Sequence, residues 1–392
     1  MTKNNVWFVL ILTLVVSALS AQTPGETILA SYERIFIRSS LNTKVNVLSD
    51  AAHDESAAEF YGPLCEAALR FVINNAALFS NDPDMINIAV AAVRGVGEYA
   101  YNPAAETLWQ AFLRLPDNVI RYEILETLPA LDTRPLTEKI NEFIAEQNRR
   151  YKPGMDNEYQ ILLPLFAILA KTGDESSYPV LFSAGVIYKG PLEEKAVKAF
   201  FEIDGNVYNF FVNVILNNPH EEKLYALKLV FSREGFSGEE KSKLAETALE
   251  IALALPGDKR REIQELGEMS LAVIEETGWI RALPQVFKYY NQSLAAFRYD
   301  MSGKQALINA INCLGNLKSV DAAQILTLQL GLYNSRFSDL QADEYEVVLA
   351  LIHALGRLGY KASYDALHYA SILSYPEEIT EAARKALANL KW

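Results

Sequence analysis

The sequence predicts an all-α protein in which one antiparallel helix pair recurs along the chain. Apolar residues recur at spacings of three and four through most of the sequence, and the period-two alternation of half-buried strands is almost absent. Gly and Pro fall between these amphipathic stretches, where helices end. The chain has 392 residues, more than a single hydrophobic core usually accommodates, so it must divide into domains or extend as an array.

Composition excludes several classes of protein. With 50% hydrophobic and 22% charged residues, and only 19 Gly and 15 Pro, the chain is neither collagenous nor a low-complexity disordered protein. Its formal net charge of −13 has the wrong sign for binding phosphate backbones, so we expect no nucleic-acid partner. Two cysteines are too few for a disulfide scaffold. We expect Cys65 and Cys313 to be buried, unpaired thiols, with a disulfide between them as the alternative.

The first residues are typical of a signal peptide. Lys3 supplies a basic start, Val6–Leu19 is an uncharged and mostly apolar run, and Ala18-Leu19-Ser20 provides small residues for cleavage. The apolar run spans about 21 Å as a helix, short of the roughly 30 Å of a bilayer core. We therefore expect residues 1–20 to be removed and the mature chain to be exported without a membrane span. A bacterial periplasm is the favoured location, with secretion as the alternative.

A glycine-containing turn recurs between predicted helices at irregular intervals of roughly 30 to 45 residues. Its clearest copies are 92–97, 168–173, 312–318 and 354–359, the last reading Ala-Leu-Gly-Arg-Leu-Gly. A second amphipathic stretch follows each turn. Glycine at such a turn permits the positive φ with which a helix ends. One helix pair cannot bury its own apolar face, but stacked pairs can bury one another's.

This pattern resembles HEAT-type repeats in their bacterial form, which are rich in a Leu-Gly-x-Leu-Gly turn, and residues 347–390 are the best copy. The resemblance implies a right-handed α-solenoid of about seven to eight antiparallel helix pairs over residues 85–392. Residues 21–84 are less regular. We expect them to form an N-terminal helical cap, with helices near 27–37, 41–50 and 55–78.

No motif in the sequence indicates catalysis. The chain contains four histidines, and His220 lacks the second histidine four residues on that a zincin needs. Gly95 and Gly97 end a predicted helix and do not open one after a strand, so they do not form a phosphate-binding loop. We therefore predict no catalytic residue, no cofactor and no metal site. Catalysis by residues distant in sequence remains the alternative.

The second helix of several pairs carries unusually few charges. Asn206, Asn209, Asn213 and Asn217 follow helical spacing, which places them on one face. Solvated faces normally carry Glu, Lys or Arg, because Asn is a poor helix former. Later second helices repeat this uncharged character. The residues predicted to line a partner-binding groove are Tyr178, Tyr188, Asn206, Tyr208, Asn209, Asn213, Asn217, Gln285, Tyr289, Gln292, Gln324, Thr327 and Asn334.

In HEAT-like solenoids the second helices line the concave surface, so the resemblance implies that these residues face a groove. Such side chains are suited to protein recognition. The alternative is that neighbouring helices crowd them and leave no room for charge. The leading hypothesis is a non-catalytic, exported scaffold that binds a protein or peptide. The alternatives are a self-assembling envelope component and an accessory factor resembling HEAT-like chromophore lyases.

Overall fold

The computed structural model describes residues 24–79, 82–152, 159–254, 261–300 and 303–391. Helices make up most of these residues and no strand occurs among them, which confirms the prediction of an all-α protein. An isolated parallel bridge joins Tyr360 to Lys391. None of the helices in these ranges is both long and apolar enough to cross a bilayer. The predicted signal peptide, residues 1–20, lies outside the described residues.

The chain divides into two compact units, the first ending at Asn206 and the second beginning at Val207. The even-numbered helices of the first unit are α2 (Pro24–Arg38), α4 (Ala58–Phe79), α6 (Ala105–Arg114), α8 (Thr137–Arg150) and α10 (Tyr178–Ile187). Its odd-numbered helices are α3 (Leu41–His53), α5 (Pro83–Glu98), α7 (Asn118–Thr127), α9 (Tyr159–Thr172) and α11 (Pro191–Glu202). Helices α2, α3 and α4 lie where the N-terminal helices were predicted.

The second unit has the same alternation. Its even-numbered helices are α12 (Val207–Asn217), α14 (Gly238–Leu253), α16 (Leu283–Asp300), α18 (Val320–Asn334) and α20 (Tyr364–Ile372). Its odd-numbered helices are α13 (His220–Phe231), α15 (Arg261–Thr277), α17 (Lys304–Asn316), α19 (Ala342–Leu358) and α21 (Glu377–Ala388).

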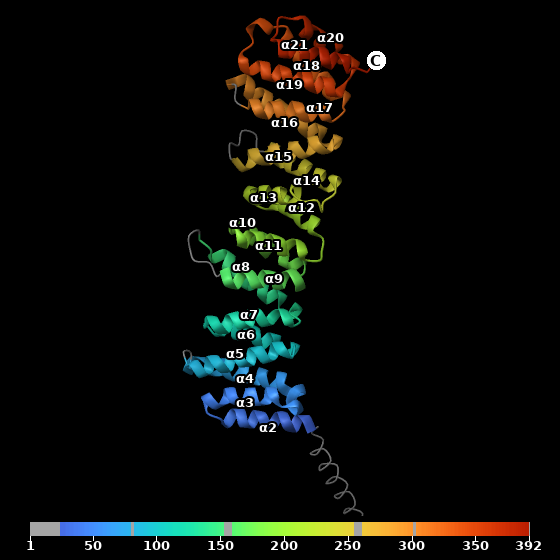
Figure 1. The fold of residues 1–392 in the computed structure, drawn as a ribbon. Coiled ribbons are helices and arrows are strands. Elements are labelled where there is room, and N and C mark those ends of the chain that lie inside the picture. Colours follow the sequence, from blue (N-terminus) through green and yellow to red (C-terminus); the bar gives the residue numbers. More distant parts are fainter. Residues whose placement is uncertain (1–23, 80–81, 153–158, 255–260, 301–302, 392) are drawn as a thin grey trace, which may run out of the picture. The chain divides into compact units, whose positions relative to one another are not determined.

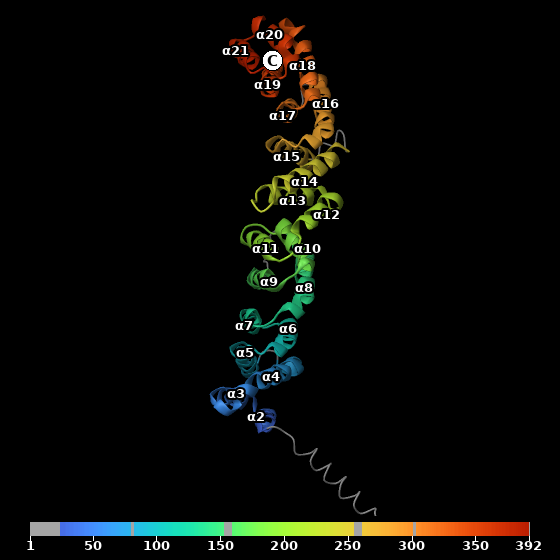
Figure 2. The same ribbon diagram turned by 90° about the vertical axis from the view of Figure 1, so that its right-hand side faces the viewer.

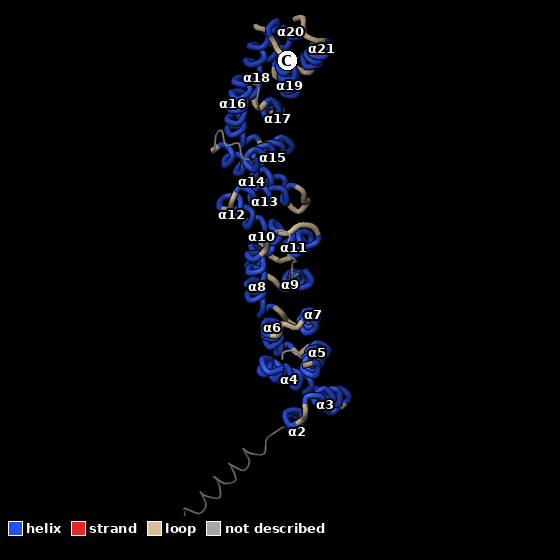
Figure 3. Tube along the Cα trace, turned by 90° about the vertical axis from the view of Figure 1, so that its left-hand side faces the viewer, coloured by secondary structure: helices blue, strands red, loops and turns tan. Residues whose placement is uncertain are grey.

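Within each unit the helices form two layers. Odd-numbered helices lie side by side on one flank and even-numbered helices on the other, as the side views show (Figures 2 and 3). In the first unit α5 packs on α7 and α4 on α6, while in the second α17 packs on α19 and α18 on α20. Each helix therefore buries its apolar face against its partner in the pair and against the next helix of its own layer. This repeat-like packing is compatible with a helical solenoid.

Short 3-10 turns precede many of the even-numbered helices. They are η1 (Glu55–Ala57), η2 (Asn102–Ala104), η4 (Arg134–Leu136), η5 (Glu175–Ser177), η6 (Ile280–Ala282) and η8 (Lys361–Ser363), whereas η3 (Leu128–Ala130) and η7 (Phe337–Asp339) follow α7 and α18. In four pairs a residue with positive φ reverses the chain just before the even helix begins. These residues are Ala100 (46°), Gly278 (62°), Lys318 (49°) and Gly359 (69°).

The two glycines of the recurring turn have different roles. Gly359 supplies the positive φ, as predicted. Three residues earlier, Gly356 stays helical, and a Cβ there would stand 3.0 Å from Ala386 on α21. Gly315 has the same position in α17, where a Cβ would stand 2.8 Å from the Cα of Ala354 on α19. These glycines thus allow neighbouring odd helices to approach closely. The sequence predicted that the glycine of each turn supplies the positive φ. This is wrong for the turn after α17, where Lys318 and not Gly315 has positive φ.

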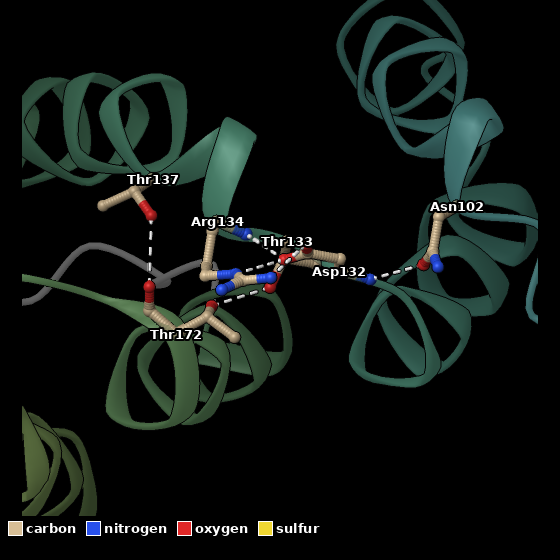
Figure 4. A network of polar contacts seen from close by, with 6 residues as sticks. All are labelled: Asn102, Asp132, Thr133, Arg134, Thr137 and Thr172. Carbon is tan, nitrogen blue, oxygen red and sulfur yellow. Dashed lines mark hydrogen bonds and ion pairs between the residues drawn. The ribbon is translucent and has the colours of Figure 1, made fainter.

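Polar contacts join three successive turns of the first unit (Figure 4). The backbone N–H of Asp132 donates to Asn102 Oδ1 at 2.7 Å, which ties the α7–α8 turn to η2. On the other side, the Thr133 and Thr172 hydroxyl oxygens lie 2.7 Å apart, and the Thr137 hydroxyl donates to the Thr172 carbonyl at 3.4 Å. Arg134 binds the Asp132 carboxylate and lowers its pKa to about 2. The turns are therefore held in register by side chains as well as by helix packing.

Three lysines cap the helices that precede them. Lys44, Lys223 and Lys241 are each the fourth residue of a helix, and their ammonium groups donate to carbonyls in the last turn of the helix before. A cation at a helix C-terminus is favourable, because unsatisfied carbonyls gather there. Lys44 and Lys223 are buried, and burial lowers the pKa of both.

Both cysteines are free and buried, as expected. Cys65 lies on α4 and Cys313 on α17, in different units. Burial raises the pKa of the Cys65 thiol to about 12 and raises that of Cys313 as well. Reactive cysteines need thiolate character, so these two are structural.

Lys318→Gly is expected to stabilise the second unit. A non-glycine residue in the left-handed region costs about 1–2 kcal/mol, partly offset here by the larger entropy of glycine in the unfolded chain. We expect a net gain of up to about 1 kcal/mol, seen as a higher midpoint of urea unfolding. Gly359→Ala, at the equivalent turn, is the matched change and is expected to lower the midpoint. Equal midpoints for both variants would contradict the assignment of strain to Lys318.

Alkaline pH is expected to destabilise the fold. Burial raises the pKa of Tyr289 to about 12 and also raises those of Tyr61, Tyr290 and Tyr375. These groups and the two thiols stay protonated in the folded chain while their unfolded counterparts ionise from about pH 8.5 to 10. The unfolded state then binds fewer protons, so stability falls as pH rises from about 8.5 toward 12.

The measurement is urea unfolding at pH 8, 9.5 and 10.5. Buried Lys44 and Lys223 have lowered pKa values, so they make the free energy of unfolding rise with pH. The tyrosines and thiols with raised pKa values outnumber these two lysines. A free energy of unfolding that stays constant or increases over this range would contradict the expectation.

Candidate functional site

Three of the four residues of the predicted Asn face lie on α12, whereas Asn206 precedes this helix. Asn209, Asn213 and Asn217 are exposed, and the Asn217 amide donates to Asn213 Oδ1 at 2.6 Å. Tyr208 is half-buried. Asn206 is exposed and belongs to the first unit, where its backbone N–H donates to Glu175 Oε1 at 2.7 Å.

The two tyrosines predicted on α10 and just after it are core residues. Tyr178 and Tyr188 are each only 2% exposed. The Tyr178 ring packs 4.9 Å from Phe200 and the Tyr188 ring 4.9 Å from Tyr151, measured between centroids. The expectation that they face a partner is therefore wrong. Tyrosine is amphipathic, and here its ring fills the space between the layers.

On α16 the predicted face is rotated by one residue. Gln285, Tyr289 and Gln292 are half-buried, whereas the residues one position earlier, Pro284, Lys288 and Asn291, are exposed. Tyr289 packs toward α15, where a Cβ on Gly267 would stand 3.0 Å from the tyrosine ring. One residue corresponds to about 100° of helix rotation. The outer surface of α16 therefore carries a positive charge that the prediction did not include.

On α18 the predicted polar residues serve the contact with α20. The Asn334 amide donates to the Ala366 carbonyl at 2.9 Å, and Asn334 Oδ1 accepts from the Tyr375 hydroxyl at 3.2 Å. The hydroxyl oxygens of Thr327 and Ser363 lie 2.9 Å apart. Gln324 is exposed, as predicted. These contacts support the alternative interpretation for Thr327 and Asn334, in which a neighbouring helix crowds the residues.

An apolar pocket of about 620 Å³ lies beside these residues, between α18 and α20. Its lining comprises Thr327, Leu328, Gly331, Leu332, Asn334, Ser335, Ala362, Asp365, Ala366, Tyr369 and Leu373. Three of its large apolar side chains face solvent: Leu328 is 69% exposed, Leu332 47% and Tyr369 57%. Exposed apolar side chains gathered around a pocket make this surface a candidate for interaction with another molecule.

A second, polar pocket of about 500 Å³ adjoins the first and shares Leu332 and Ser335 with it. Its charged side chains are engaged by neighbours on the same surface. The Arg336 guanidinium pairs with Glu344, and Arg298 donates to Gln329 Oε1 at 3.0 Å. Glu344 also accepts a hydrogen bond of 3.0 Å from the backbone N–H of Gln341, the residue that caps the start of α19. This pocket therefore has defined hydrogen-bonding geometry beside an apolar surface.

Leu328 and Leu332 were not among the predicted groove residues, although the spacing of the leucines in α18 indicates a second apolar face. Leucines occupy positions 326, 328, 330 and 332, so they lie on two opposite faces of α18. A helix with two apolar faces needs a partner on each side to bury both. Leu326 and Leu330 are buried, whereas Leu328 and Leu332 are exposed, so half of this apolar surface has no cover.

Among the described residues, no group of three or more His, Cys, Asp or Glu side chains is placed to hold a metal ion. The α18–α20 surface combines apolar area with a few fixed polar groups, which makes it the candidate site of this chain.

No family model matches the chain, and no curated protein matches it. Among solved structures, it is similar to an engineered protein known from a crystal structure, with 13% sequence identity and a TM-score of 0.35 over 92% of this chain and 98% of that chain. A similarity this weak carries no argument about fold or function.

Gly331→Ala is expected to stabilise the protein. Gly331 lies within α18 at the pocket, and a Cβ there would meet no atom within 4 Å. Replacing a helical glycine in open space gains about 0.4–1 kcal/mol. For a unit of this size we expect the melting temperature to rise by up to about 4 °C. Gly315→Ala is the control and should lower it, because its Cβ would collide with α19. A lower melting temperature for both variants would show that the α18 backbone does not tolerate a side chain at position 331.

Proposed function

We propose that this chain is a non-catalytic scaffold that binds a protein or peptide partner on the even-helix layer of its second unit, over the pocket between α18 and α20. The observation that supports the proposal is the exposure of Leu328, Leu332 and Tyr369 around one apolar pocket. Soluble proteins seldom leave such side chains together in water unless another molecule covers them.

The energetics of this surface favour a protein partner. Full burial of a leucine-sized side chain contributes about 1.5–3 kcal/mol. Binding energy at protein interfaces concentrates in a few apolar and aromatic residues surrounded by polar ones. Leu328, Leu332 and Tyr369 form such a centre, and the engaged charges of the adjoining pocket form part of its border.

The repeat family and the cellular location of the chain are part of the same proposal. We take the helix pairs of residues 85–392 to be HEAT-like repeats, about seven to eight in number, of a right-handed α-solenoid. We also take residues 1–20 to be a signal peptide that directs the chain to a bacterial periplasm. The recurring turn, with its close-packed helical glycine and its residue of positive φ three positions later, supports the repeat assignment.

Self-assembly through stacked ends is the second candidate, and the outer face of α21 argues against it. Ile379, Ala382 and Ala386 of this helix are buried. Apart from Ala388, the exposed residues of this helix are charged: Glu377, Glu378, Glu381, Arg384 and Lys385. A polar outer face is typical of a helix that closes a repeat array. The accessory-lyase alternative has no metal-binding cluster of His, Cys, Asp or Glu to support it in the part of the chain that the structure describes.

Leu328→Asp is expected to abolish partner binding without loss of folding. The side chain is 69% exposed, so the change costs little stability but places a charge at the centre of the apolar surface. Residues 21–392 would be immobilised and exposed to native envelope extract, and retained proteins quantified by mass spectrometry. The identified partner would then be purified and its affinity measured for each variant.

Val119→Asp is the matched control, because Val119 is 57% exposed but lies in the first unit. Asn213→Arg tests the Asn face of α12 in the same experiment. Loss of binding in Leu328→Asp alone supports the proposal. Unchanged affinity in Leu328→Asp contradicts it, and loss in Asn213→Arg alone would move the partner to α12. If no protein is retained, sedimentation at high concentration would decide for or against self-assembly.

A further inference from the structure

The floor of the α18–α20 pocket offers a ligand apolar surface and few hydrogen bonds. The hydroxyls of Thr327 and Ser363 lie within hydrogen-bonding distance of each other, and Asn334 is bonded to Ala366 and Tyr375. The Ser335 hydroxyl donates to the Leu332 carbonyl at 2.8 Å. These polar side chains are thus satisfied within the fold. A group that enters beside Leu328, Gly331 and Leu373 must therefore be apolar, since a polar one would lose its hydrogen bonds to water.

One charged group lines this pocket, and it is a carboxylate. Asp365 is exposed on α20 and forms no ion pair with any residue in the described ranges. Its nearest histidine on the helix, His368, is stacked on the Tyr364 ring at 5.7 Å between centroids. Tyr369 follows Asp365 by four residues, so both lie on the same face of α20 and both line the pocket. A carboxylate beside an exposed aromatic ring is suited to a cation.

The adjoining pocket does not cancel this charge. Its two arginines, Arg298 and Arg336, are balanced by two carboxylates, Asp339 and Glu344. The lining of the two pockets together therefore keeps one negative charge, that of Asp365. The formal net charge of −13 on the whole chain adds a long-range attraction for cationic partners.

We infer that the α18–α20 site takes a peptide segment in which an arginine flanks a large apolar side chain. The apolar side chain lies against Leu328 and Leu332, while the guanidinium pairs with Asp365 and stacks on Tyr369. Arginine suits this position better than lysine, because its planar group binds carboxylates in a bidentate manner and stacks on rings. This inference rests on the proposed function and specifies its partner.

The test is parallel selection of a random dodecapeptide library, displayed on phage, against the chain and its variants. For the unaltered protein, enriched peptides are expected to carry arginine within a few residues of Leu, Phe or Trp. Asp365→Arg is expected to remove the arginine preference and to enrich Asp and Glu in its place. Asp321→Arg is the matched control, because Asp321 is exposed on α18 but does not line the pocket. It should leave the enriched set unchanged.

Affinity of one enriched peptide, measured by fluorescence anisotropy, completes the test. Asp365→Asn is expected to weaken it roughly tenfold, the lower range for loss of a hydrogen bond to a charged group. Replacing the arginine of the peptide by citrulline should have a similar effect. Apolar peptides that show no arginine preference and bind Asp365→Arg equally well would overturn the inference and leave the proposed function standing. Selection that yields the same peptides from Leu328→Asp, or none from either protein, would contradict both.

Discussion

Each unit depends on close contact between successive helices of the same layer, because an isolated pair leaves too much apolar surface in water. At three contacts in the odd layer the helices approach to a distance that glycine allows. A Cβ at Gly97 would stand 2.9 Å from Thr127 on α7, one at Gly315 would stand 2.8 Å from Ala354 on α19, and one at Gly356 would stand 3.0 Å from Ala386 on α21. At these contacts the absence of a side chain sets the separation of the two odd helices.

The fold class could be predicted from the sequence because it depends on periodicity, which is local and repeated many times. The conformation of individual turns could not. Gly359 and Gly278 have positive φ, as a glycine turn suggests, but at the equivalent positions the chain has Ala100 and Lys318. Sequence alone does not separate a glycine needed for its backbone from one needed for its small size. That distinction depends on the neighbouring helix, which lies about 30 to 40 residues further on. The buried lysine caps at Lys44 and Lys223 were missed for a similar reason, since a lone lysine in a first turn resembles any solvated one.

The candidate site was predicted less well than the fold, for reasons that differ between helices. On α12 the Asn face is exposed as expected, because its spacing alone defines one side of the helix. On α16 the choice of Gln285, Tyr289 and Gln292 was wrong by one residue, since polar side chains on two adjacent faces left the orientation undetermined. On α18, Asn334 is polar because it bonds to α20, and the side chains available to a partner are the leucines beside it. Hydropathy rules assign leucine to the core, so the sequence shows two leucine faces on α18 but does not show which of them stays exposed until the packing is known.

The charged outer face of α21 bears on how chains of this kind change length. A further pair cannot stack on a surface of Glu381, Arg384 and Lys385 without desolvating those charges. Loss of α21, in turn, would expose the apolar side of α19 around Gly356, where Ala386 now packs. A pair inserted between two existing pairs would instead meet neighbours like those it separates. The charged face of α21 therefore makes internal positions the better tolerated ones for gain or loss of a pair.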